Sequence, residues 1–124
     1  MNNCGFLLID KPEGITSFQV ISQLRKITSI KRIGHTGTLD PFATGLLPIC
    51  IGPATRLASF VSSASKTYLA TIKLGIKTDT GDLTGKIVST KPVEKLPAEI
   101  IQKTVKAILA IKEQTPPQYS AIKV

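Results

Sequence analysis

The stretch that decides the fold covers residues 34–48 and reads GHTGTLDPFATGLLP. Its first part is rich in glycine, proline and small side chains, so residues 33–45 are expected to form a loop that turns sharply and can approach a ligand closely. Its last part opens an apolar run, which predicts a strand over residues 46–51. The stretch therefore predicts a tight loop leading directly into a strand.

The same loop holds the chain's single histidine, His35, close to a carboxylate, Asp40. One interpretation is structural: Asp40 followed by Pro41 is typical of a turn, with His35 as a solvated or capping side chain. A phosphate-binding loop is excluded, because the G-x-x-x-x-G-K-[ST] spacing is missing. A serine hydrolase triad has little support, because no G-x-S-x-G motif is present.

A carboxylate can also react alone, as a nucleophile at a sugar carbon or as a base, in a dry pocket. Leu39 and Phe42 flank Asp40 and are suited to exclude water. Tyr68 is the second candidate, because it opens an alternating pattern over residues 66–74 that predicts a half-buried strand. Its ring is suited to stack on a base, and the competing interpretation is a core tyrosine whose hydroxyl lies at the edge.

Moving outward from the loop, a buried strand is expected over residues 5–9 and a turn over 10–14. A helix is expected over 16–28, where Thr16 and Gln19 form a capping box and Phe18, Ile21, Leu24 and Ile27 share one face. Further along, the pattern predicts a short helix from Pro53 to Val61, with Leu57, Phe60 and Val61 facing inward. The rest of the chain is expected to form a polar loop over residues 78–82, a strand over 86–90, a helix over 97–112 and a strand-like run over 118–124.

Composition sets broad limits. The 124 residues and 13.3 kDa are the size of one ordinary domain, and 42% hydrophobic residues indicate a globular chain. A net charge of +8 and a pI near 9.7 favour a polyanionic partner, nucleic acid before an anionic membrane. Two distant cysteines, no export signal and no apolar run of about 18 residues predict a cytoplasmic protein with no membrane contact. A single histidine argues against a zinc site.

Taken together, the motifs resemble those of the bacterial tRNA pseudouridine-55 synthases (the tRNA pseudouridine synthase B family). The resemblance covers essentially the whole chain and is most specific over residues 34–48. Other matching motifs follow in the same order: Asp10-Lys11-Pro12-x-Gly14, Gly52-x-Ala54-Thr55-Arg56-Leu57, Lys66-x-Tyr68, Leu74-Gly75-x-x-Thr78-Asp79-Thr80-x-Asp82 and Pro116-Pro117-x-Tyr119-Ser120-Ala121-x-Lys123.

The resemblance implies a cofactor-independent isomerase that converts one uridine in the T-loop of tRNA to pseudouridine. Asp40 matches the family's catalytic aspartate, which acts at the ribose or forms a covalent adduct. Tyr68 matches the tyrosine that stacks on the target base, and His35 matches a histidine that helps to hold the flipped-out nucleotide. The implied partner is the T stem-loop of tRNA, with no protein partner required, and extrusion of the nucleotide costs a few kcal/mol.

The implied fold is α+β: a mixed, mainly antiparallel sheet with packed helices. Family members continue beyond this length with an active-site arginine and commonly a C-terminal RNA-binding domain. The chain is therefore expected to be the N-terminal portion of the catalytic domain, and an isolated 124-residue product is not expected to turn over. Two alternatives stay open: a non-catalytic RNA-binding module, and a subunit of the guide-RNA-dependent pseudouridine synthases, which share the Gly-His-x-Gly-x-Leu-Asp-Pro core.

Overall fold

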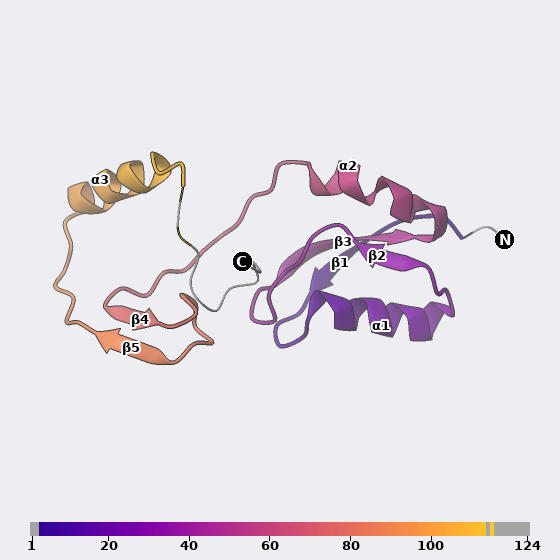
Figure 1. The fold of residues 1–124 in the computed structure, drawn as a ribbon, viewed down its shortest axis with the longest axis horizontal. Helices are drawn as coiled ribbons and strands as arrows, with labels where there is room; N and C mark the ends of the chain where they lie inside the picture. The colour runs from indigo at the N-terminus through magenta and orange to yellow at the C-terminus, as the bar shows by residue number, and fades with distance from the viewer. Residues whose placement is uncertain (1–2, 114, 116–124) are drawn as a thin grey trace. The chain divides into compact units, whose positions relative to one another are not determined.

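The structure is a computed structural model that describes residues 3–113 and 115. Its contacts divide the chain into two units, Met1–Tyr68 and Leu69–Val124 (Figure 1). Each unit is considered by itself. Among the described residues, no helix combines the length and the hydrophobicity that a bilayer crossing requires.

The first unit contains a three-stranded antiparallel sheet. Its strands are β1 (Gly5–Lys11), β2 (Ile33–His35) and β3 (Gly45–Ile51), with β3 in the centre. The two longer strands, β1 and β3, confirm the strands that the apolar runs predicted. β2 was missed, because it lies inside the predicted loop and three residues are too few to show alternation. Ile33 pairs with Ile51 on the central strand, so tertiary pairing forms this strand.

A helix, α1 (Ser17–Thr28), follows β1 and begins where the capping box predicts. The Thr16 hydroxyl accepts a hydrogen bond from the Gln19 N–H at 3.1 Å, and the Gln19 side chain accepts one from the Thr16 N–H at 2.7 Å. The helix ends at Ser29, which is in the left-handed region and donates its N–H to the Arg25 carbonyl.

The core of this unit lies between α1 and one face of the sheet. It consists of the buried side chains Val20, Ile21, Ile33, Leu47 and Ile49. The predicted helix stripe is partly wrong, because Phe18 and Ile27 are exposed and Val20 is buried instead. The prediction that the first strand is buried is also wrong: Phe6 and Leu8 are exposed on the face that α1 does not cover, and Leu7 on the other face is 37% exposed.

After β3 the chain forms a 3-10 helix, η1 (Gly52–Leu57), and a short helix, α2 (Ala58–Ser62). Gly52 has φ +61°, and a Cβ there would collide with the Asn3 carbonyl oxygen, so only glycine fits at this corner. The inward face predicted for this segment is wrong at Leu57 and Phe60, which are exposed, whereas Ala54 is buried.

The strand predicted over residues 66–74 is not formed. An alternating pattern gives a strand only where another backbone accepts and donates the ladder hydrogen bonds, and no described residue pairs with this segment. The second unit contains β4 (Ile76–Thr78) paired antiparallel with β5 (Ile87–Thr90), followed by α3 (Ala98–Leu109). The predicted strand over 86–90 and helix over 97–112 are confirmed, and residues 118–124 lie outside the described residues. The α+β class is confirmed.

Candidate active site

Asp40 lies on the loop between β2 and β3 and is exposed to solvent. Its carbonyl accepts a hydrogen bond from the Ala43 N–H at 3.0 Å, which closes a tight turn with Pro41 in its second position. The turn predicted from Asp40 and Pro41 is therefore present. It leaves the Asp40 side chain free to meet a ligand from outside.

The loop is fixed on the C-terminal side of Asp40 by a buried lysine. Lys11 is fully buried, and its Nζ donates to the carbonyls of Pro12 at 2.9 Å, Ile15 at 2.8 Å and Pro41 at 3.3 Å. The Pro41 carbonyl also accepts the Gly14 N–H at 2.8 Å. A buried cation is tolerated where carbonyl oxygens replace its water, so Lys11 joins the turn after β1 to the turn at Asp40.

The loop is fixed on the N-terminal side of Asp40 by a buried serine. The Ser17 hydroxyl accepts the Leu39 N–H at 2.9 Å and donates to the Leu39 carbonyl at 3.1 Å. Ser17 is the first residue of α1, so the loop is held against the start of that helix. Both neighbours of Asp40 in the sequence are thus anchored, which limits the positions that its carboxylate can take.

His35 is the last residue of β2 and pairs with Ile49. It is half-buried, and its Nδ1 is fully buried with no hydrogen-bond partner among the described residues. The next residue, Thr36, is buried and donates its N–H to the Pro48 carbonyl at 3.1 Å. His35 is therefore held at the start of the loop that carries Asp40.

Tyr68 stands apart from this arrangement. It is the last residue of the first unit, 68% exposed, in a segment without regular structure. No hydrogen bond in the described part of the chain joins Tyr68 to His35 or Asp40. The structure thus places His35 at the start of the loop that carries Asp40 and does not bring Tyr68 to them.

In the second unit, the turn between β4 and β5 is organised by Asp82. Its carboxylate accepts hydrogen bonds from the Thr84 hydroxyl at 2.6 Å, the Thr84 N–H at 2.8 Å and the Thr80 hydroxyl at 2.8 Å. These bonds favour the charged form and lower the pKa of Asp82. The sequence predicted a polar loop over residues 78–82 but not the hydrogen bonds that the Asp82 carboxylate accepts from Thr80 and Thr84.

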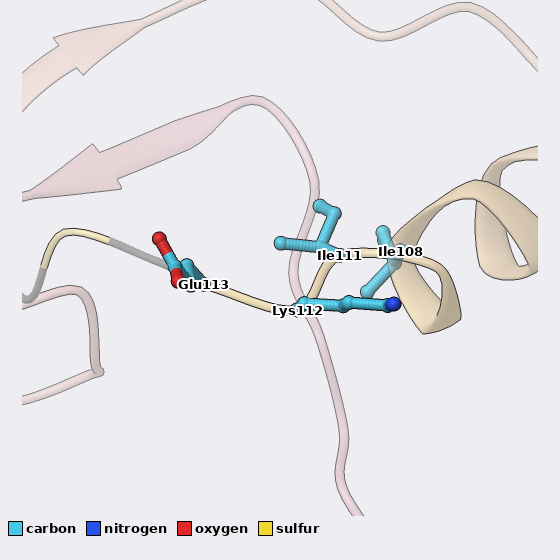
Figure 2. A pocket seen from close by; sticks show the side chains of 4 residues that line it. All are labelled: Ile108, Ile111, Lys112 and Glu113. Atoms are coloured by element: carbon cyan, nitrogen blue, oxygen red, sulfur yellow. The ribbon is translucent and has the colours of Figure 1, made fainter.

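A hollow of about 260 Å³ lies at the C-terminal end of α3 (Figure 2). Ile108, Ile111, Lys112 and Glu113 line it. None of the residues that the sequence marked as catalytic or binding is among them, so the candidate site stays on the loop at Asp40.

The profile of the TruB family pseudouridylate synthases (N-terminal domain) matches residues 25–124. This chain belongs to the TruB family. Among its relatives are the tRNA pseudouridine synthases B of Dehalococcoides mccartyi, 50% identical over 119 residues, and of Bacillus cereus, 49% identical over 124 residues. These alignments cover 96% and 97% of this chain, but only 40% and 39% of the relatives.

The chain thus spans about 40% of the length of these TruB-family relatives. Among solved structures, it is similar to the structure of an H/ACA RNP bound to a substrate RNA containing 2'-deoxyuridine. That match has a TM-score of 0.44 and 41% identity over 45% of this chain and 18% of the other.

Sequence reasoning missed Lys11 and Ser17, the two side chains that fix the loop in this TruB-family chain. Lys11 was placed in a turn over residues 10–14, because this segment is rich in turn-forming residues. Its burial arises from three carbonyls that the fold brings together from two separate turns. No local pattern carries that information, although the Asp10-Lys11-Pro12 motif did mark the position.

Proposed function

We propose that this chain is the N-terminal portion of the catalytic domain of an enzyme that isomerises uridine to pseudouridine at position 55 in the T-loop of tRNA, in the cytoplasm. In this reaction the bond between ribose C1′ and uracil N1 breaks, the base turns, and C1′ bonds to C5. C5 then loses its proton to solvent, and N1 takes up a proton from solvent. The reaction is internally balanced, so no cofactor is required. The proposed substrate is tRNA, with no protein partner.

The single observation that carries the proposal is the anchoring of the loop around Asp40. A reacting carboxylate must be held in place before the substrate arrives, because disorder at the reacting group raises the barrier. Hydrogen bonds fix Leu39 on one side and Pro41 on the other, while Asp40 itself stays exposed. A nucleotide extruded from a folded RNA would meet a carboxylate that is already positioned.

His35 and Tyr68 are proposed to bind the extruded nucleotide. His35 opens the same loop and has a buried ring nitrogen with no protein partner among the described residues. Because that nitrogen is enclosed by the protein, the accessible part of the half-buried ring is the part proposed to contact the nucleotide. Tyr68 offers an exposed ring, and base stacking contributes about 1–3 kcal/mol.

The test is the modification of unmodified tRNA by a chimaera in which residues 1–124 replace the matching part of the Dehalococcoides mccartyi relative, assayed beside the 124-residue chain. Release of tritium from C5 of uridine follows turnover, and sequencing locates the product. The chimaera is expected to modify position 55 without added guide RNA. Tritium release that requires a guide RNA, or RNA binding without release, would select one of the alternative functions. Turnover by the 124-residue chain alone would overturn its assignment as an incomplete catalytic domain.

A further inference from the structure

Exposed charge around the sheet of the first unit is divided between the two ends of the sheet; Lys11, at the acidic end, is buried. The three acidic residues of this unit, Asp10, Glu13 and Asp40, lie where β1 ends and β3 begins. The other end of β3 is surrounded by five exposed cations, which we call the basic pole: Arg25, Lys26, Lys31, Arg32 and Arg56. No acidic residue occurs between Glu13 and Asp40 or between Asp40 and Asp79, so no carboxylate of this unit lies at the basic pole.

Three elements assemble the basic pole. Arg25 and Lys26 are in the last turn of α1, Lys31 and Arg32 precede β2, and Arg56 is in η1. The Arg32 Nε donates to the Thr55 hydroxyl at 2.7 Å, and the Arg32 carbonyl accepts the Gly52 N–H at 2.8 Å. Arg25 Nη2 donates to the Ile33 carbonyl at 3.0 Å. Two guanidinium groups are therefore held in place.

A helix dipole explains only part of this cluster. Cations in the last turn stabilise a helix, which accounts for Arg25 and Lys26. Lys31, Arg32 and Arg56 lie outside the helix, and their mutual repulsion is not relieved by any acid of this unit. Cations that are gathered, exposed and partly fixed form a surface that binds a polyanion strongly, because binding releases the counterions of the polyanion.

We propose that the basic pole binds the phosphate backbone of the stem of the RNA whose loop presents uridine to Asp40. The proposal rests on the proposed function for its choice of RNA. β3 spans roughly 20 Å at about 3.3 Å per residue, so the pole lies about that far from the loop at Asp40. An RNA helix lying along the sheet contacts the pole with its backbone while its loop reaches Asp40. Pole residues give affinity and orientation, and they give no sequence selectivity.

The experiment compares two variants of the 124-residue chain that each lose three cations. In the pole variant, Lys26→Ala, Lys31→Ala and Arg56→Ala remove exposed side chains that make no hydrogen bond in the described structure. In the control variant, Lys103→Ala, Lys106→Ala and Lys112→Ala remove exposed cations of the second unit. Binding of a T stem-loop RNA is measured by fluorescence anisotropy over a range of salt concentrations.

The slope of log affinity against log salt is expected to be smaller by roughly 2 to 3 in the pole variant and unchanged in the control. Equal slope changes in both variants, an unchanged slope in the pole variant, or no RNA binding by the chain would overturn the proposal. So would binding of anionic phospholipid vesicles that is lost in the pole variant while its RNA slope stays the same. Circular dichroism checks that both variants fold. If the pole variant does not fold, Lys31→Ala with Arg56→Ala, both outside α1, takes its place and is expected to reduce the slope by about 2.

An Asp40→Asn chain separates this proposal from the catalytic one. This variant is expected to bind RNA with the same slope of log affinity against log salt concentration as the parent chain. If the chimaera described above makes no pseudouridine but the pole variant still lowers the slope, the proposed function fails and the basic pole stands. If the chimaera is active and both triple variants keep the full slope, the basic pole fails and the proposed function stands.

Discussion

At the scale of single residues, the loop that carries Asp40 is held by side chains that lie outside it. Lys11 and Ser17 belong to β1 and α1, and each bonds to a residue next to Asp40. Their removal is expected to act first on the folded state and only through it on the reaction. Asp82 has the same kind of role in the second unit, where its carboxylate organises a turn.

Replacing Lys11 with methionine keeps most of the side-chain volume but removes the three hydrogen bonds to the carbonyls of Pro12, Ile15 and Pro41. The free energy of unfolding is expected to fall by roughly 2–3 kcal/mol, as for bonds to a charged group. Urea unfolding followed by circular dichroism measures it. Lys26→Met, at an exposed position, should stay within about 0.5 kcal/mol of the parent; equal losses in the two variants would contradict the anchoring role.

The Asp82 network predicts a pH dependence. The folded pKa of Asp82 lies below its ordinary value of about 4, so the network stabilises the turn fully above that value. The stabilisation is lost as pH falls from about 4 through the lower folded pKa. The amide signal of Thr84, which donates to this carboxylate, should shift over that low range in NMR spectra. A shift centred at or above the ordinary value would argue against the network, and Asp82→Asn should abolish the shift.

At the scale of elements, the sequence predicted best where the signal is local. The capping box placed the start of α1 at the observed residue, and the glycine-rich stretch placed the turn at Asp40. The sequence predicted poorly where pairing or packing decides. β2 is a strand because it pairs with β3, whereas residues 66–74 form no strand because no described segment pairs with them. Phe18 is exposed because α1 packs against the sheet through Val20.

The capping box itself is testable. Thr16→Ala removes the oxygen that accepts the Gln19 N–H and should lower the free energy of unfolding by about 1 kcal/mol. Thermal unfolding measures the loss. Gln23→Ala, on the exposed middle of the same helix, is the matched control and should be neutral or slightly stabilising, because alanine favours the helix. A Thr16→Ala variant as stable as the control would show that the cap contributes nothing.

At the scale of the whole molecule, the two units differ in how much they bury. The first has a core of five apolar side chains, whereas α3 has no buried residue. An isolated helix of its length is marginal in water, because helices are stabilised mainly by packing of an apolar face. Composition predicted one ordinary domain from length and hydrophobic content, and it could not reveal that apolar residues of the second unit would remain exposed.

Hydrogen exchange tests this difference with two helices of equal length, α1 and α3, each of 12 residues. Amides of α1 are expected to be protected to nearly the extent of β3, because α1 shares the core with that strand. Amides of α3 should exchange at close to unprotected rates. Equal protection of the two helices would mean that α3 is packed in solution.

The central claim is that the carboxylate of Asp40, positioned by its anchored neighbours, is the reacting group. The most direct measurement is single-turnover conversion of uridine to pseudouridine at position 55 of tRNA by the chimaera carrying Asp40→Asn, compared with Glu13→Gln. Both changes remove one exposed carboxylate from the same end of the sheet. Conversion should become undetectable with Asp40→Asn while RNA binding is kept, and it should persist with Glu13→Gln. Pseudouridine formed at the parent rate by the Asp40→Asn enzyme would contradict the account.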